Sequence, residues 1–256
     1  MGTVPAVFIL PEDIELTAGP ASFHRQFLDS YISQFDKSYL SDLVSYRKVL
    51  LQRNRLLKEI AENPRQTDQL EAWDKLLIEH SVRIIEARRK FIDAINDSTR
   101  SFYADFNTNS VLELVYVPKV DRTDINLAEA ISVQLNEYRS REIRAGLTLV
   151  GPHRDRLKID LNGRAVRHYG SRGQKRCVML AMKLAVAEYL AKITENDVIL
   201  ILDEVFAELD NSKSRALMKT LNKHKQVFIA TAGELDFHDQ DIKKFLVVDG
   251  KIEETG

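Results

Sequence analysis

Val198-Ile199-Leu200-Ile201-Leu202-Asp203-Glu204 is the stretch of sequence that decides the fold. An unbroken aliphatic run is typical of a parallel strand buried on both faces, and open α/β sheets bind ligands at the carboxyl ends of such strands. Two carboxylates there suit a Walker B site, in which Asp203 holds Mg²⁺ through a water and Glu204 orients or deprotonates the attacking water. Taken alone, a strand that happens to end in an acidic turn would explain the same residues.

The elements around this strand predict an α/β sheet, because strands and helices alternate from about residue 111 onward. Gly146 is a suitable C-terminal stop for a helix, and Asn162-Gly163 is the strongest hairpin signal in the chain. Strands are expected at 111–117, 147–150, 157–161, 226–230 and 245–248, and helices at 125–144, 173–191 and 211–221, with a short helix before the last strand and a turn at Asp249-Gly250.

A long helical hairpin is expected before that region. Glycine is absent from 23–106, and Asn63-Pro64 is the only strong break in the helical pattern there. Apolar residues recur at helical spacing on both sides of the break, which predicts two long helices folded back as an antiparallel pair. Core packing explains their apolar stripes, although the exposed tip around 63–68 could contact a partner.

Another motif, Ser171-Arg172-Gly173-Gln174, opens a long apolar helix. The Ser171 hydroxyl, a close backbone approach at Gly173 and free N-terminal amides would together form a cradle for a phosphate. Lys175 and Arg176 are cations near the start of the helix, where they oppose its dipole, and this favours an anion held nearby. A serine N-cap with incidental surface charges is the alternative.

Two further features bear on phosphate binding. Glu208-Leu209-Asp210 precedes a helix, and Asp210 is either its N-cap alone or part of a nucleotide-site loop. Between His153 and Arg176, eight basic and two acidic residues give a local charge of +6, a footprint for the phosphates of ATP, DNA or both. A solvated, charged strand edge is the competing interpretation. The sequence has no helix-turn-helix, zinc-finger or aromatic RNA-binding signature, so we expect DNA contacts to be directed at the backbone.

Composition narrows the class of protein. The 256 residues are 44% hydrophobic, enough for one large domain or a core domain plus a smaller lobe, and the net charge of −1 gives no global field for nucleic acid or membranes. Cys177, the only cysteine, excludes a disulfide framework and is expected in the core. No apolar run could span a bilayer and no leader is visible, so we expect a cytoplasmic protein. The apolar stretch 4–10 suggests a fragment that starts just before a strand.

Taken together, the motifs resemble those of ABC-class ATPase heads. The order and spacing match, with 171–174 as the signature, 198–204 as Walker B and 208–210 as the D-loop. Arg172 replaces the usual first glycine of transporter signatures, and the hairpin is far too short for the coiled coil of SMC proteins. Three segments are similar to the RecF family in particular: Pro11-Glu12-Asp13, Arg25-Gln26-Phe27-Leu28-Asp29 and Gly151-Pro152-His153-Arg154-Asp155.

The resemblance implies a fold and a site. It predicts an α/β fold, an ABC-type ATPase head lobe whose mixed sheet has flanking helices, with an inserted antiparallel helical hairpin. Residues 1–22 would be a remnant of an N-terminal ATPase lobe, 23–108 the helical arm, and 109–256 the C-terminal ATPase lobe. Ser171 and Gly173 would face the γ-phosphate of ATP bound to the opposite subunit, and Thr231 stands where a switch histidine is usual. The nucleotide contacts carried over are Ser171, Arg172, Gly173, Gln174, Asp210 and Thr231, with Glu204 as the catalytic residue and Asp203 as the metal ligand.

A phosphate-binding motif is missing from the sequence. No G-x-x-x-x-G-K-[ST] pattern occurs, because the only Gly-Lys pair, Gly250-Lys251, continues with Ile252. In RecF-like proteins the P-loop lies in an N-terminal lobe, which this sequence lacks wholly or almost wholly. We therefore expect this chain by itself to bind ATP and Mg²⁺ poorly and to hydrolyse nothing measurable.

The resemblance also implies a role and partners. The whole protein would be a weak DNA-dependent ATPase and an ATP-dependent homodimeric clamp on duplex and gapped DNA, working with RecR-like and RecO-like proteins to help load a recombinase. The alternative is a non-catalytic scaffold that binds DNA or partner proteins through the hairpin and the basic region. An ABC transporter subunit is disfavoured by Arg172 and the hairpin.

Overall fold

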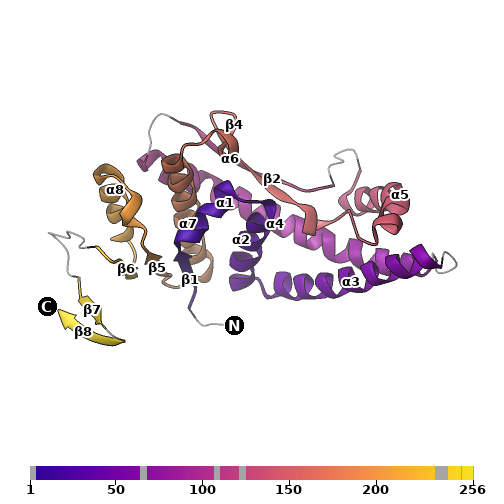
Figure 1. Cartoon of the computed structure of the whole chain (residues 1–256), viewed down its shortest axis with the longest axis horizontal. Coiled ribbons are helices and arrows are strands. Elements are labelled where there is room, and N and C mark those ends of the chain that lie inside the picture. Colours follow the sequence, from indigo (N-terminus) through magenta and orange to yellow (C-terminus); the bar gives the residue numbers. More distant parts are fainter. Residues whose placement is uncertain are drawn as a thin grey trace.

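A computed structural model of the chain describes residues 4–63, 68–106, 110–120, 125–233, 242–248 and 250–255. Its central sheet is parallel and three-stranded, in the order β1-β5-β6 (Figure 1). β1 (Ala6–Ile9) and β6 (Gln226–Ala230) flank β5 (Ile199–Asp203). The aliphatic stretch is therefore a parallel strand, as predicted, and it is the middle one of the three; Leu200 and Leu202 are completely buried, whereas Ile199 and Ile201 on the other face are half-buried.

The helix opened by the signature motif is the most buried element of the fold. α7 (Arg172–Thr194) packs against β1 and α4, and residues 176–187 are buried without interruption. Cys177 lies in this run and is 1% exposed, so it is the core residue that the sequence predicts.

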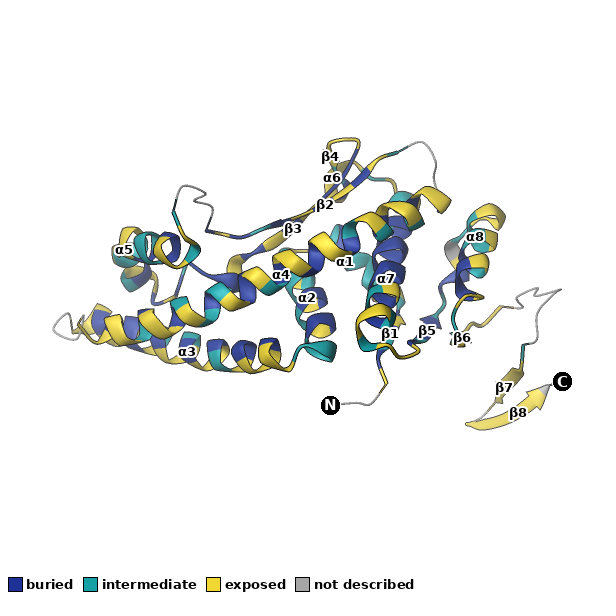
Figure 2. Ribbon diagram, turned by 180° about the vertical axis from the view of Figure 1, so that it is seen from behind, coloured by how far each residue is buried: buried dark blue, intermediate teal, exposed yellow. Residues whose placement is uncertain are grey.

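The helical hairpin is also confirmed. α3 (Lys37–Glu62) and α4 (Leu70–Phe106) pack along each other, and most of the tip that joins them, residues 64–67, lies outside the described residues (Figures 1 and 2). The prediction of a single helix before Asn63 is wrong, because α2 (Ala21–Phe35) precedes α3 as a separate helix. Asp36 is extended at the junction and its side chain accepts the Tyr39 N–H at 2.9 Å, so a capping aspartate ends one helix and starts the next.

A second, antiparallel sheet lies over the arm. It contains β2 (Leu112–Val117), β3 (Arg156–Leu161) and β4 (Arg164–Ala165) in that order. Asn162 and Gly163 have φ values of 50° and 75°, so the turn signal is confirmed as a hairpin with two left-handed central residues. α5 (Leu127–Ala145) ends at Gly146, whose φ of 61° makes it the left-handed cap that the sequence predicts.

The strand expected at 147–150 does not form. The Thr148 N–H donates to the Asn54 side chain at 2.7 Å, and the Leu149 N–H donates to the Glu142 carboxylate at 2.6 Å. Side chains of the arm and of α5 satisfy these backbone donors, so the apolar stretch has no need of a strand partner.

The C-terminal elements follow the predicted order. η4 (Phe206–Glu208) and α8 (Asn211–Leu221) come between β5 and β6. β7 (Lys244–Val248) pairs with β8 (Lys251–Thr255), which the sequence did not predict because only Ile252 in it is apolar. The short helix expected before β7 falls largely on residues 234–241, outside the described residues, as does Asp249 of the expected turn.

The remaining described elements are short: η1 (Pro11–Ile14), α1 (Glu15–Ala18), η3 (Pro152–Arg154) and α6 (Val166–Tyr169). One hydrophobic cluster joins side chains from all three segments proposed as domains, so the boundaries at 22 and 108 remain predictions. Within the described part of the chain, no helix has both the length and the apolar character that a membrane span requires.

Candidate functional site

Three of the predicted motifs converge at one end of the central sheet. The Arg176 guanidinium on α7 donates to the carbonyl oxygens of Glu204 and Val205 at 3.0 and 3.2 Å, which holds the start of α7 at the end of β5. α8 begins shortly after β5, and its Leu217 and Leu221 belong to the same hydrophobic cluster as the buried residues of α7. The signature, Walker B and D-loop segments are thus neighbours in space.

The signature motif opens α7 with a capping box. The Ser171 hydroxyl accepts the Gln174 N–H at 3.2 Å, and the Gln174 side chain accepts the Ser171 N–H at 2.8 Å. Ser171, Arg172 and Gly173 are exposed. Among the residues that the structure describes, a Cβ added at Gly173 would meet nothing within 4 Å beyond its neighbours in α7, so packing against these residues does not require glycine there.

The two carboxylates lie at the end of β5, as predicted. Asp203 pairs with Ala230 in β6 and is half-buried. Glu204 has a φ of 48°, a left-handed conformation that is uncommon for a residue with a side chain. Its N–H donates to the Ala230 carbonyl at 3.0 Å, and its carboxylate accepts the Ala232 N–H at 2.6 Å. Glu204 is therefore fixed to the loop that follows β6.

The D-loop aspartate and the switch-position threonine lie at the surface. Asp210 accepts the N–H groups of Ser212 and Lys213 and pairs with the Lys213 ammonium, and these bonds lower the pKa of its carboxyl group. Asp210 is therefore the N-cap of α8 that the sequence predicts. Thr231 is exposed, and its hydroxyl accepts the Gly233 N–H at 3.2 Å.

Arg176 does not have the role that the sequence suggests. It is 8% exposed and donates to backbone carbonyls at the end of β5. Its charge at the start of α7 therefore has a structural explanation, and it is no longer an argument for an anion.

The basic segment 153–176 is exposed in part. Arg154, Arg156, Lys158, Arg164 and Arg167 are exposed, and Lys158 forms an ion pair with Asp160 at 2.8 Å. Asp155 is completely buried, where it accepts hydrogen bonds from the Tyr116 hydroxyl and the Lys119 N–H. Burial raises the pKa of the Asp155 carboxyl group, and its hydrogen bonds oppose that shift.

Buried polar networks, which sequence reasoning missed, involve all three of the family-like segments. Lys183 on α7 donates to Asp13 at 2.7 Å, to the Phe8 carbonyl and to the Tyr31 hydroxyl. Arg88 on α4 donates to Asp29 at 2.7 Å and to the Pro152 carbonyl at 2.8 Å. For Lys183 the available signal was a lone cation inside an apolar helical run, since such residues are rarely buried without a partner, whereas Arg88 is followed by Arg89 and Lys90 and gave no such signal.

This arrangement defines the class. A parallel strand ending in two carboxylates, beside a helix opened by a serine capping box and a capped loop helix, is the lobe of an ABC-type ATPase head that carries the signature and Walker B motifs, here with an inserted helical hairpin.

The comparisons with known proteins place the chain more narrowly. It is 36% identical over 245 residues to the DNA replication and repair protein RecF of Chloroherpeton thalassium, covering 93% of this chain and 67% of the relative. It is 35% identical over 256 residues to the RecF protein of Agathobacter rectalis, covering 98% and 69%. The chain belongs to the RecF family, and it spans about two thirds of the length of these relatives.

Solved structures agree. Structures of the recombination mediator protein RecF in the RecFOR pathway, as RecF-ATP and as RecF-ATPrS, superpose on the whole chain with a TM-score of 0.89 and 32% identity, covering 68% and 69% of their own chains. No protein-family model matches the chain.

Proposed function

We propose that this chain supplies the signature, Walker B and D-loop lobe of an ATP-gated DNA clamp that acts in recombinational repair. The observation that supports the proposal is that α7, which the signature motif opens, is held at the end of β5 by the hydrogen bonds from Arg176 to the Glu204 and Val205 carbonyls. RecF relatives are described with ATP, and the sequence of this chain has no P-loop, so the rest of the nucleotide site would come from outside it.

The exposed signature fits a ligand that lies outside the chain. Ser171 and Gly173 are exposed, and none of the described residues fills the space beside Gly173. A glycine that its own chain does not require suits the close approach of another backbone or of a phosphate. The proposal places there the γ-phosphate of ATP held by a second subunit, with Arg172, Gln174, Asp210 and Thr231 around it.

The carboxylates fit the chemistry of hydrolysis. Mg²⁺ in nucleotide sites is held by one or two carboxylates together with phosphates and waters, so a single carboxylate at the end of β5 is an adequate contribution from this lobe. Asp203 would take that role. Glu204, fixed by Ala232, would orient the attacking water or accept its proton. Mg²⁺ held there would neutralise negative charge on the phosphates.

The partners follow from the same assignment. ATP sandwiched between two copies would close the clamp on duplex or gapped DNA, and hydrolysis would open it. The pathway named for the RecF relatives suggests RecR-like and RecO-like proteins as partners in loading a recombinase. A non-catalytic scaffold is the second candidate, favoured by the absence of a P-loop pattern from this sequence.

Sedimentation with duplex DNA tests the proposal. The chain would be compared alone and joined to the P-loop lobe of a RecF relative, each with and without ATP. The clamp predicts ATP-dependent dimerisation and DNA binding for the joined protein only. If the chain alone binds DNA equally with and without ATP, and the joined protein gains nothing from ATP, the scaffold is the better description.

A further inference from the structure

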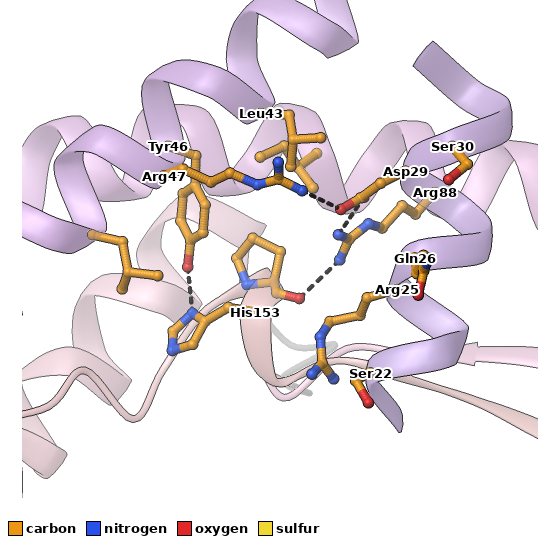
Figure 3. Close-up of a pocket in the computed structure, with 13 residues that line it drawn as sticks. Ser22, Arg25, Gln26, Asp29, Ser30, Leu43, Tyr46, Arg47, Arg88 and His153 are labelled. Atoms are coloured by element: carbon orange, nitrogen blue, oxygen red, sulfur yellow. Dashed lines mark hydrogen bonds and ion pairs between the residues drawn. The ribbon is translucent and has the colours of Figure 1, made fainter. Parts of the chain in front are cut away.

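A pocket of about 390 Å³ lies between α2, α3, α4 and η3, and it uses none of the residues assigned to the nucleotide site. Figure 3 shows the side chains that line it, with Arg47 directed at Asp29 and Arg25 extending from α2 below the Arg88 side chain. The helices bring together groups more than 100 residues apart, since Tyr46 on α3 donates its hydroxyl hydrogen to Nδ1 of His153. The pocket therefore forms only when these distant segments of the chain pack together.

The pocket carries a net positive charge. Its charged side chains are Arg25, Arg47, Arg88 and Asp29, which sum to +2. His153 adds no charge at neutral pH, because burial lowers its pKa to about 4, with further lowering from Arg154 and Arg25. Its Nε2 lies 3.0 Å from the Thr148 carbonyl, so a neutral ring with hydrogen on Nε2 satisfies both of its contacts.

Arg88 and Asp29 are committed to the fold. Arg88 is 2% exposed and donates to the Tyr39 hydroxyl, to Asp29 and to the Pro152 carbonyl. Asp29 accepts from Arg88 and from the Tyr39 hydroxyl through the same oxygen. Arg88 is thus a fixed positive charge beneath the pocket, and its partners come from this chain.

Arg25 and Arg47 are the cations available to a ligand. Arg47 pairs with Asp29 at 3.2 Å, but its side chain is 64% exposed. Arg25 donates to the Asp155 carbonyl at 3.0 Å and is half-buried. Burial, followed by repulsion from Arg88, lowers the pKa of Arg25. Two arginines held near a third cation form a site that an anion would stabilise.

The positive field continues beyond the pocket. Burial lowers the pKa of His24 to about 4, and repulsion from the positive charges of Arg25, Arg167 and Arg156 contributes to the same shift. Repulsion from the positive charge of Arg154 likewise lowers the pKa of Arg25. The geometry agrees, because Arg25 donates to the carbonyl of Asp155, which lies between Arg154 and Arg156 in the sequence, and α6, which carries Arg167, packs against β3. A ligand that extends from the pocket over these arginines must carry several negative charges along its length.

We propose that this pocket binds a backbone phosphate of DNA between Arg25 and Arg47, with the strand continuing over Arg154, Arg156 and Arg167. The inference rests on the proposed function and gives it a DNA contact separate from the nucleotide site. A run of spaced cations matches the repeating phosphates of a strand, whereas a free anion would use only the pocket.

Fluorescence anisotropy of a short labelled duplex at low salt, without ATP, tests the proposal on the chain as it stands. Arg47→Gln and Arg25→Gln should each weaken binding about threefold to tenfold and lower the salt-dependence slope by about one. Arg55→Gln is the matched control. Arg55 is on the same helix, is 75% exposed and also pairs with a carboxylate, but it does not line the pocket.

Circular dichroism and urea unfolding would establish that each variant is folded, and Arg47→Gln keeps the test valid if Arg25→Gln is not. No binding by the parent chain, unchanged binding by both pocket variants, or an equal loss in Arg55→Gln would overturn the proposal. Inorganic phosphate, titrated at constant ionic strength, provides another arm. If phosphate displaces the DNA at a concentration well below that at which chloride does, the pocket would be reassigned to a free anion.

The outcome is separable from that of the clamp. The pocket is assayed without ATP in this chain, whereas the clamp is assayed by ATP-dependent dimerisation of the joined protein. Loss of DNA binding in the pocket variants, with no ATP-driven dimer, would support the pocket and reject the clamp. Unchanged DNA binding in the pocket variants, together with an ATP-driven dimer of the joined protein, would support the clamp and reject the pocket.

Discussion

The carboxylate of Glu204 accepts the backbone N–H of Ala232 at 2.6 Å, so the candidate catalytic residue is joined to the loop that carries Thr231. The same glutamate is held in a left-handed conformation by its own N–H, which donates to Ala230. Both contacts run from the end of β5 to the end of β6. A change in backbone position at the carboxyl end of either strand therefore affects the other strand.

Glu204→Gln should abolish turnover and preserve assembly in a protein that carries the P-loop lobe. Glutamine keeps an oxygen that can accept the Ala232 N–H, but it cannot take a proton, so ATP hydrolysis should fall by about 100-fold or more. Steady-state ATPase assays and sedimentation with ATP measure the two effects. Glu195→Gln is the control, because Glu195 also has a positive φ, of 53°, and is exposed at the far end of α7. Unchanged turnover would reject the assignment of Glu204.

Ser171→Arg should leave ATP binding intact and prevent ATP-driven dimerisation, because a large cation would occupy the exposed start of α7. The substitution also removes the capping box, which costs about 1 kcal/mol. Ser171→Ala removes the cap without adding bulk and is therefore the control. Analytical ultracentrifugation of both variants with ATP separates the two causes. A dimer that survives Ser171→Arg would remove the proposed contact across subunits.

Much of the fold could be predicted from the sequence because its signals are local. The aliphatic run before Asp203, the Asn162-Gly163 turn and the break near Asn63 each specify an element without reference to distant residues. The absence of a strand at 147–150 could not be foreseen, because its backbone donors are taken by Asn54 and Glu142, which are remote or in another element.

The site was predictable in part for the same reason. The motif positions follow from spacing, and Asp210 caps α8 as expected. The role of Arg176 depends on the two carbonyls that it meets at the end of β5, and the Arg25 pocket depends on the packing of four elements. The spacing of apolar residues along one segment does not show which residues of other elements pack against it, so it could predict neither the role of Arg176 nor the pocket that Arg25 lines.

Substitution of Arg53 should lower the urea concentration at which the arm unfolds. Arg53 is completely buried and donates to Asp74, Glu142 and Thr148 at 2.7, 2.7 and 2.8 Å, which joins α3, α4 and α5. Arg53→Met leaves a buried glutamate without its cation, at a cost of about 3–5 kcal/mol. Urea denaturation measures the loss. Arg55→Met, at an exposed pair on the same helix, should cost less than about 1 kcal/mol. Equal effects would mean that the network adds nothing.

Acid should destabilise the protein before its carboxylates titrate. The pKa values of His24 and His153 are lowered from 6.5 to about 4, mainly by burial, so the unfolded chain binds protons at these residues more readily than the folded chain. The stability is complete above pH 6.5 and is lost as the pH falls toward 4, by about 2 kcal/mol per histidine at pH 5. Urea unfolding from pH 7 to pH 5 measures the slope. His153→Gln should reduce the slope, whereas His168→Gln, at an exposed residue, should not. A flat profile for the parent chain would contradict the prediction.

α4 is a single helix of 37 residues, about 55 Å long, that packs against α3 and α5 at one end and against α7 and α8 at the other. Its sequence contains neither glycine nor proline, so it has no built-in hinge. A partner that pushes on the tip of the arm would therefore tilt a stiff rod whose other end lies beside the signature helix. The arm is therefore a rigid element, and a displacement of its outer end would be transmitted along α4 to α7 without a partner touching α7.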